Sequence, residues 1–197
     1  MRSVIVLAPA VAALLFVAPP AGAAEGGPLT VTSARVSLEG TSNIHAYTAS
    51  TTDVRVTTIE FSGTPSSDVL AYALEPGALK AFTVVIPAAS LKSEKSDLNK
   101  NMHKALKVQE FAEMAFRLRA LEAAGAAYRA LGTLTVAGVE QDVTLAVQVV
   151  RTGASLAVTG ATDLLMTDYG ITPPKAMLGM LKTNPKVRIT IELVLGA

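Results

Sequence analysis

The feature that most constrains this chain is an alternation of apolar and polar residues, repeated in segment after segment. In QDVTLAVQVV, residues 141–150, valine and leucine occupy every second position from Val143 to Val149. Residues 186–195 repeat the pattern, with Val, Ile and Leu on one face. Because successive side chains of a strand point to opposite faces, these segments predict strands with one buried face.

About eight such strands are expected, or nine if the region 44–63 is divided in two. The expected strands are 30–40, 44–52, 54–63, 78–86, 114–122, 127–136, 140–151, 154–167 and 185–195. Between two of them, Ala137 and Gly138 mark a tight hairpin turn, because glycine accepts a positive φ. Many short strands joined by tight turns indicate an all-β barrel or sandwich.

One segment departs from this pattern and predicts an amphipathic helix. SDLNKNMHKALKV places Leu98, Met102 and Leu106 four residues apart, which gives one apolar stripe for packing against the sheet. Ser96 or Asp97 is expected to cap its start.

A second departure lies near the C-terminus, in LLMTDYGITPPKAMLGMLK. Thr172 suits the N-cap of a helix, Pro173 or Pro174 its first turn and Lys182 its last turn. We therefore expect a short helix over residues 174–181, lying over one mouth of the barrel. Its methionines suit either an adaptable gate for a variable chain or an ordinary helix that caps the core.

The first 23 residues have the pattern of a secretory signal peptide. A positive start precedes an apolar core at residues 4–17, and small residues mark a cleavage site after position 23 or 24. The alternative is a membrane anchor, but the apolar run is shorter than the roughly 20 residues that a spanning helix needs. Residues 24–197 are then expected to form one domain of a periplasmic or secreted protein.

The composition excludes several kinds of site and partner. The chain has 17 basic and 16 acidic residues, and loss of the arginine in the signal leaves no net charge, so nothing points to nucleic acid. The absence of cysteine excludes disulfides, thiolate metal sites and a lipidated cysteine. Five Phe, four Tyr and no Trp are too few for the aromatic girdles of an outer-membrane barrel. A soluble barrel with its apolar face inward is therefore favoured.

No pattern of catalytic or metal-binding residues stands out. His45 and His103 are the only histidines, and neither has a second histidine at ligand spacing. The serine-hydrolase elbow, the phosphate loop and the dinucleotide fingerprint are all missing from the sequence. We expect no enzyme, no cofactor and no metal. The catalytic alternative is His45 acting with Ser42 or a nearby carboxylate.

The expected helix and its approach are rich in lysine. Five lysines lie between Lys92 and Lys107, against Glu94 and Asp97. They form either a solvated helix face or a surface that meets anionic lipid headgroups or a pyrophosphate.

Four stretches, in order, resemble the YceI-like family of exported bacterial lipid-binding proteins. GTSNIHAYTAST (40–51) is similar to the family's motif after the first strand, with Tyr47 where related motifs often carry Trp. DLNKNMHKALKVQEFAEMAFRL (97–118) resembles its helix and following strand, and GTLTVAGVEQDVTL (132–145) its central hairpin. LLMTDYGITPP followed by LKTNPKVRITIEL resembles its C-terminal end.

The resemblance implies an antiparallel eight-stranded lipocalin-like barrel and a long-chain isoprenoid or similar lipid as ligand. An eight-stranded barrel either is filled by side chains or holds one small ligand, and the small inward residues favour a cavity. A filled barrel with a structural or interaction role is the alternative, and the chain is expected to be a monomer or a homodimer. The expected ligand-binding residues are His45, Phe82, Val84, Met102, Phe116, Leu145, Val147, Met166, Tyr169, Met177, Leu178, Leu181, Ile189 and Ile191.

Overall fold

The computed structural model describes residues 29–65, 67–176 and 180–197, and the expected signal peptide at 1–23 lies outside them. The strands are β1 (Thr30–Ser42), β2 (Ala46–Thr51), β3 (Arg55–Phe61), β4 (Leu79–Pro87), β5 (Glu113–Ala124), β6 (Ala127–Val136), β7 (Val139–Thr152), β8 (Ser155–Leu165), β9 (Lys175–Ala176) and β10 (Leu181–Gly196). Two short α-helices, α1 (Val69–Tyr72) and α2 (Ser96–Ala105), accompany them. The all-β prediction is confirmed, and the alternating segments are the strands.

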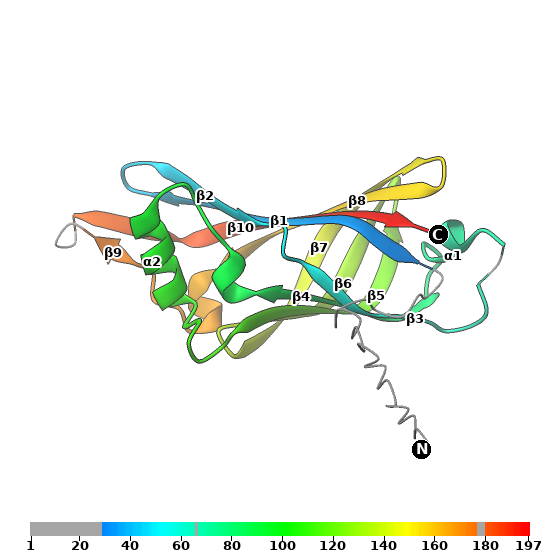
Figure 1. Ribbon diagram of the computed structural model, residues 1–197, viewed down its shortest axis with the longest axis horizontal. Coiled ribbons are helices and arrows are strands. Elements are labelled where there is room, and N and C mark those ends of the chain that lie inside the picture. The colour runs from blue at the N-terminus through cyan, green and yellow to red at the C-terminus, as the bar shows by residue number, and fades with distance from the viewer. Residues whose placement is uncertain (1–28, 66, 177–179) are drawn as a thin grey trace, which may run out of the picture.

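The strands form one strongly curled antiparallel sheet. Nine of them follow the order β2-β1-β10-β8-β7-β6-β5-β4-β3, and β9 pairs only with β10. Figure 1 shows that the sheet curls around an elongated interior, with α2 at one end and α1 at the other. Strands adjacent in the sequence are mostly adjacent in the sheet, and β10 lies between β1 and β8.

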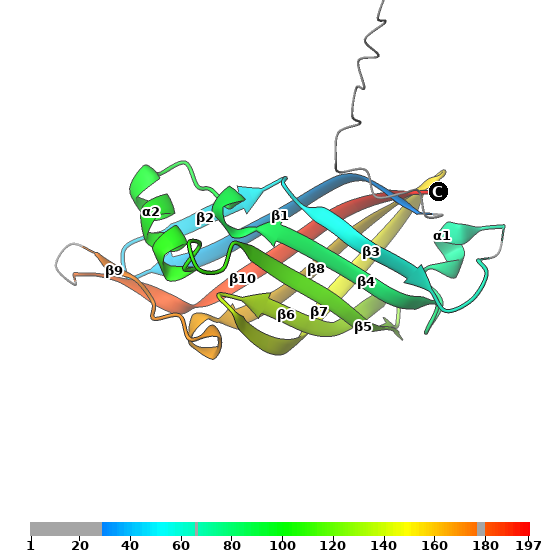
Figure 2. The same ribbon diagram turned by 60° about the horizontal axis from the view of Figure 1, so that its bottom comes forward.

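The prediction of a closed eight-stranded barrel is wrong in strand number and in closure. The edge strands β2 and β3 are not paired with each other in the described part of the chain, so the sheet is a half-barrel. After residue 51 the chain leaves β1 and pairs with β4 instead. A single bridge, with two backbone hydrogen bonds of 2.8 and 3.1 Å between Ser50 and Lys92, joins β2 to the segment after β4. Figure 2 shows β2 and β3 following each other along this side.

Helix α2 forms where the spacing of Leu98, Met102 and Leu106 predicts it. Met102 and Leu106 are buried against the sheet, which confirms the apolar stripe. The predicted cap is wrong: the N-cap is Lys95, without a side-chain hydrogen bond, and Ser96 is already helical.

The start of α2 is held instead by Asn99. Its Oδ1 accepts hydrogen bonds from the backbone N–H and the hydroxyl of Ser93, at 2.7 and 2.9 Å, and its Nδ2 donates to the Ser93 carbonyl at 3.0 Å. This clamp ties the first turn of α2 to the segment that precedes it.

The predicted short helix at 174–181 is wrong. Lys175 and Ala176 form β9, which pairs with Leu181 and Lys182 at the start of β10. The helical turn lies earlier, as the 3₁₀ turn η2 (Met166–Tyr169). The residues that favour a helix cap and a first helical turn do not decide the structure here. The chain folds back on itself, and β10 begins four residues before Pro185, so Lys175 and Ala176 pair with it as a strand.

Tight turns set the register of the long strands. The β6–β7 hairpin turns at Ala137 and Gly138, with φ of 49° and 78°, as a two-residue turn between Val136 and Val139. Both positive values match the primed turns that join twisted strands. The turn predicted from Gly138 is therefore confirmed.

The end of the sheet that carries α1 is closed by a small apolar cluster. The Asp68 carboxylate caps α1 by accepting from the Ala71 N–H at 3.0 Å, and Arg151 of β7 donates to it at 2.6 Å. Beneath the helix the cluster is almost fully buried, and its members are Leu29, Leu70, Ala73, Leu156, Leu193 and Leu195. No helix among the described residues is long and apolar enough to cross a membrane.

Candidate functional site: an apolar interior with a polar rim

A cavity with a volume of about 720 Å³ lies under α2. This volume is within the range of about 300–1,000 Å³ that is typical of small-molecule sites. Its apolar wall comes from several strands, from α2 and from the segment around η2: Val36, Leu38, Ile86, Leu91, Leu98, Met102, Ala105, Leu106, Met114, Leu134, Val136, Leu164, Leu165, Met166, Ile171, Leu181, Val187 and Ile189. We call it the wide cavity.

A second cavity of about 140 Å³ continues toward α1. Its lining is apolar except for the hydroxyl of Thr162, and every lining residue is buried or half-buried. Gly160 lies in its wall, where the side chains of Leu145, Val147 and Ile191 pack over the glycine. We call it the narrow cavity.

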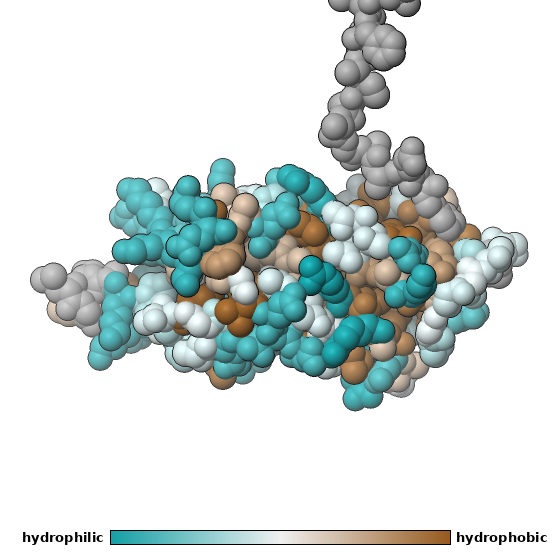
Figure 3. Space-filling view, turned by 90° about the horizontal axis from the view of Figure 1, so that it is seen from below, coloured by the Kyte–Doolittle hydropathy of each residue, from teal (hydrophilic) through white to brown (hydrophobic). Residues whose placement is uncertain are grey.

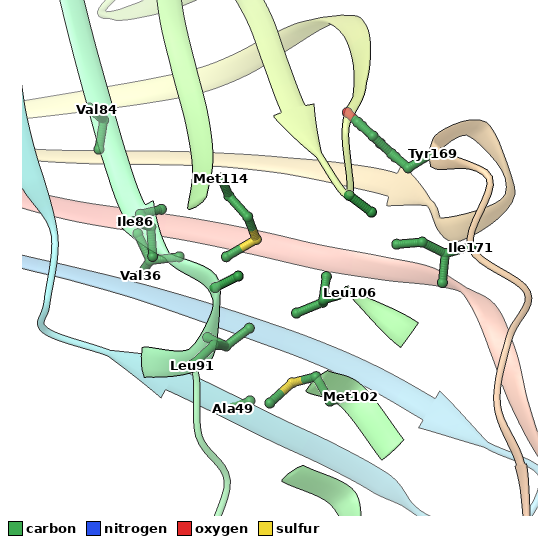
Figure 4. Packing of buried hydrophobic residues seen from close by; sticks show 12 residues of the cluster. Val36, Ala49, Val84, Ile86, Leu91, Met102, Leu106, Met114, Tyr169 and Ile171 are labelled. Atoms are coloured by element: carbon green, nitrogen blue, oxygen red, sulfur yellow. The ribbon is translucent and has the colours of Figure 1, made fainter. Parts of the chain in front are cut away.

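The two cavities adjoin. Four residues, Val36, Ile86, Leu134 and Ile189, line both of them, and they come from four different strands. Figure 4 shows Val36 and Ile86 near this junction, and Met114, Leu106, Leu91, Met102 and Ile171 converging from the surrounding elements on the α2 side. The interior is therefore one elongated apolar space, wide under α2 and narrow toward α1.

Apart from Thr162, the polar groups of the lining lie in the wide cavity, at the α2 end of this space. The wide cavity reaches the surface among exposed residues, which include His45, Lys95, Ser96, Asp97 and Lys175. The narrow cavity has no exposed residue in its lining and ends at the cluster beneath α1. A ligand that matches this arrangement has an apolar chain and can keep a polar group at the rim.

One residue in the wall of the wide cavity carries a buried hydroxyl group. Tyr169 is 4% exposed, and its hydroxyl has no hydrogen-bond partner among the described residues. Burial, with a smaller effect of the neighbouring Asp168 carboxylate, raises the pKa of Tyr169 to about 12. Gln141 of β7 holds this turn by donating to the Asp168 carbonyl at 2.7 Å. Tyr169 therefore stays neutral at physiological pH, with its hydroxyl enclosed by the protein.

The structure brings most of the expected ligand-binding residues to this interior, in two groups. His45, Met102, Met166, Tyr169, Leu181 and Ile189 line the wide cavity. Phe82, Val84, Phe116, Leu145, Val147, Ile189 and Ile191 line the narrow cavity. Met177 and Leu178 lie outside the described residues. Whether these side chains contact a ligand stays a prediction.

The list from the sequence missed part of the wall. Leu91, Leu134 and Ile171 line the wide cavity without having been expected there. Leu134 lies in the alternating pattern of β6, so its inward orientation could have been predicted. Leu91 and Ile171 lie in irregular segments, where no periodicity indicates which way a side chain points.

The catalytic alternative gains no support from the geometry around His45. The Ser42 hydroxyl donates to the backbone carbonyl of His45 at 2.9 Å and accepts from its backbone N–H at 3.1 Å. The Ser42 hydroxyl therefore stabilises the turn after β1 and is bonded to the backbone of His45 rather than to its imidazole ring. Residues 29–65, 67–176 and 180–197 also contain no cluster of three or more metal-ligating side chains.

Solved structures with the same fold include three bacterial proteins. BcnA of Burkholderia cenocepacia is 17% identical, with a TM-score of 0.66 over 82% of this chain and 95% of that chain. The Campylobacter jejuni YCEI protein is 17% identical, with a TM-score of 0.58 over 74% and 82%. A polyisoprenoid binding domain from Saccharophagus degradans, implicated in plant cell wall breakdown, is 14% identical, with a TM-score of 0.60 over 86% and 98%.

The family comparison is more direct than these structural similarities. None of the curated proteins matches the sequence. The model of the YceI-like domain matches residues 31–195, which span β1 to β10 and both cavities. The chain therefore belongs to the YceI-like family.

Proposed function

We propose that this protein binds one long-chain apolar ligand, an isoprenoid or similar lipid, along its interior. The observation that carries the proposal is the continuous apolar space formed by the wide and narrow cavities, whose exposed polar lining residues lie at the α2 end. The structural relative from S. degradans is a polyisoprenoid binding domain, which supports the same class of ligand.

The energetics suit a chain-like ligand without a charged anchor. Each methylene transferred from water contributes about 0.8 kcal/mol, from which the cost of ordering the ligand is subtracted. Affinity should therefore rise with chain length until the narrow cavity is full. Selectivity would come from the length and width of the interior.

We infer a carrier or sequestering role without catalysis, in the periplasm or outside the cell. The signal-peptide pattern of residues 1–23 supports this location, and the hydrogen bonds of Ser42 to the His45 backbone support the non-catalytic role.

The alternative of a filled barrel is weakened by the size of the wide cavity. A volume of about 720 Å³ far exceeds the roughly 30 Å³ that one water molecule occupies in the liquid.

A fluorescent displacement assay tests the proposal. Polyprenols of increasing length should displace a lipophilic probe with increasing affinity. Ile189→Trp, at the junction of the two cavities, should lower that affinity at least tenfold. Glu192→Trp, at an exposed position of the same strand, is the control. No displacement by any chain length, or equal affinity in both variants while thermal melts show both folded, would overturn the proposal.

A further inference from the structure

Two strongly exposed apolar side chains lie at the end of the molecule where the wide cavity opens. The large hydrophobic residues that are most exposed in the described chain are Ile44, Val150, Leu165 and Met180. Leu165 lines the wide cavity, and Ile44 and Met180 are 59% and 67% exposed. Val150 alone lies at the other end, near the β7–β8 turn. Burial in the core therefore does not explain Ile44 and Met180.

Ile44 and Met180 belong to two segments that are tied together. The Asn43 amide donates to the Met180 carbonyl at 2.9 Å, and its Oδ1 accepts from the Lys182 N–H at 2.8 Å. The Asn43 N–H also donates to the Lys182 carbonyl at 3.1 Å. These bonds fix the β1–β2 turn against the start of β10. Ile44 and Met180 therefore lie together at one edge of the sheet, which these hydrogen bonds hold in place.

Lysines surround this edge. Lys95 and Lys175 line the opening of the wide cavity, and Lys182 is the cross-strand partner of Lys175. None of the three forms an ion pair with a residue that the structure describes. Like charges placed directly opposite each other destabilise a sheet, so folding alone gives no reason for the pair of Lys175 and Lys182.

The acidic groups nearby do not balance these lysines. Glu94 and Asp97 also line the opening, and Asp97 lies 3.6 Å from Lys100. Other basic residues are paired, such as Arg129 with Glu122 at 2.9 Å and Lys80 with Glu60 at 3.5 Å at the far end, and Lys186 with Asp163 at 2.8 Å on the side of the wide cavity. Figure 3 shows hydrophilic residues gathered around the α2 end of the face seen from below.

We propose that this end of the protein docks on an anionic lipid bilayer, with Ile44 and Met180 entering the interface and Lys95, Lys175 and Lys182 meeting the headgroups. Apolar side chains inserted among lysines are the combination that favours anionic membranes. The contact would place the opening of the wide cavity against the bilayer, where an apolar ligand could pass without crossing water. The exchange of ligand rests on the proposed function, whereas the docking surface rests on the exposed residues alone.

Vesicle sedimentation of the purified protein tests the docking. The protein should sediment with vesicles of phosphatidylglycerol and phosphatidylethanolamine, and much less with phosphatidylcholine vesicles. Raising the salt from about 0.05 to 0.5 M should weaken binding, because the attraction to headgroups is screened. Lys95→Gln with Lys175→Gln and Lys182→Gln should weaken it by roughly a hundredfold, since each lysine near the surface contributes about fivefold.

Matched variants at the far end control for net charge and exposed apolar area. Lys80→Gln with Arg129→Gln and Arg151→Gln removes the same three charges and should retain most of the binding. Ile44→Ser with Met180→Ser should weaken binding at least tenfold, whereas Val150→Ser, at a residue that is 62% exposed, should not.

Three results would overturn the proposal. In the first, the wild-type protein does not bind anionic vesicles. In the second, the lysine variant near the opening and the matched variant at the far end bind equally well. In the third, the serine variant of Ile44 and Met180 changes only the oligomeric state in analytical ultracentrifugation. The last result would assign the edge to a second copy of the chain. Mass analysis of the bound ligand keeps the two proposals apart, because a protein without ligand that still docks contradicts only the proposed function.

Discussion

The ring of Tyr47 lies over Gly40, its cross-strand partner, so closely that a Cβ at position 40 would overlap the ring atoms. Tyr47 lines the wide cavity, and burial raises the pKa of its hydroxyl. The glycine in the GTSNIHAY motif therefore allows β2 to place an aromatic ring in the cavity wall.

Gly40→Ala should displace this ring and lower the free energy of unfolding by about 1–3 kcal/mol, the usual cost of overpacking. Chemical denaturation measures the loss. In a double-mutant cycle, the same substitution in a Tyr47→Ala background should cost clearly less. An equal cost in both backgrounds would show that the ring is not the cause.

Tyr169 predicts a dependence on alkaline pH. Its pKa of about 12 lies above the ordinary value of 10, so the folded state holds the phenol proton more tightly than the unfolded state does. The stabilisation is complete below pH 10 and is lost as the pH rises toward 12, by about 3 kcal/mol in all.

Tyr169→Phe removes this dependence. At pH 7 the variant should match the wild type within about 1 kcal/mol, because the hydroxyl has no partner among the described residues. Above pH 10 it should become the more stable of the two in denaturant titrations. If the free energy of unfolding depended on pH in the same way in both proteins, Tyr169 would not be the group responsible.

Asn99 predicts a local effect on α2. Asn99→Ala removes three hydrogen bonds to Ser93 and should cost about 1–3 kcal/mol. Hydrogen exchange should show faster exchange in α2, with the central strands unchanged. Lys100→Ala, at the exposed neighbouring residue, is the control. Uniformly faster exchange across the sheet would mean that the clamp supports the whole fold.

Gly160 predicts the length of the ligand. A Cβ there would lie 3.1 Å from Ile191 Cγ2 and 3.2 Å from Leu145 Cδ2, closer than ordinary contact, so Gly160→Leu should push these side chains aside and reduce the space in the narrow cavity. Because the leucine side chain has four carbons, the longest chain retained should shorten by about one five-carbon unit. Thr159→Leu, at the exposed neighbour, should leave the length distribution unchanged. An unchanged distribution in Gly160→Leu would exclude the narrow cavity from the site.

The sequence predicts the wall of the interior better than its closure. The period of two places Leu145, Val147 and Ile189 inward, and the structure agrees, because strand geometry alone decides the face. The number of strands around the interior depends on which edges pair, and these contacts between distant residues leave no periodic signal. The half-barrel could not be told from a closed barrel in this way.

In the C-terminal segment, local sequence signals predict a helix that the fold does not form. Helix signals at Thr172 and Lys182 are local, whereas the pairing of Lys175 with Lys182 depends on a reversal of the chain. The last strand was expected to begin at Pro185. In the structure β10 begins at Leu181, because the strand passes the proline where its register with β1 shifts.

The most direct test of the account is native mass spectrometry of the protein purified from its own host, followed by extraction and mass identification of the bound molecule. We expect one long-chain apolar ligand per protein chain, of isoprenoid or similar type. A protein that is consistently empty, and that takes up neither isoprenoids nor fatty acids when they are offered, would contradict the account.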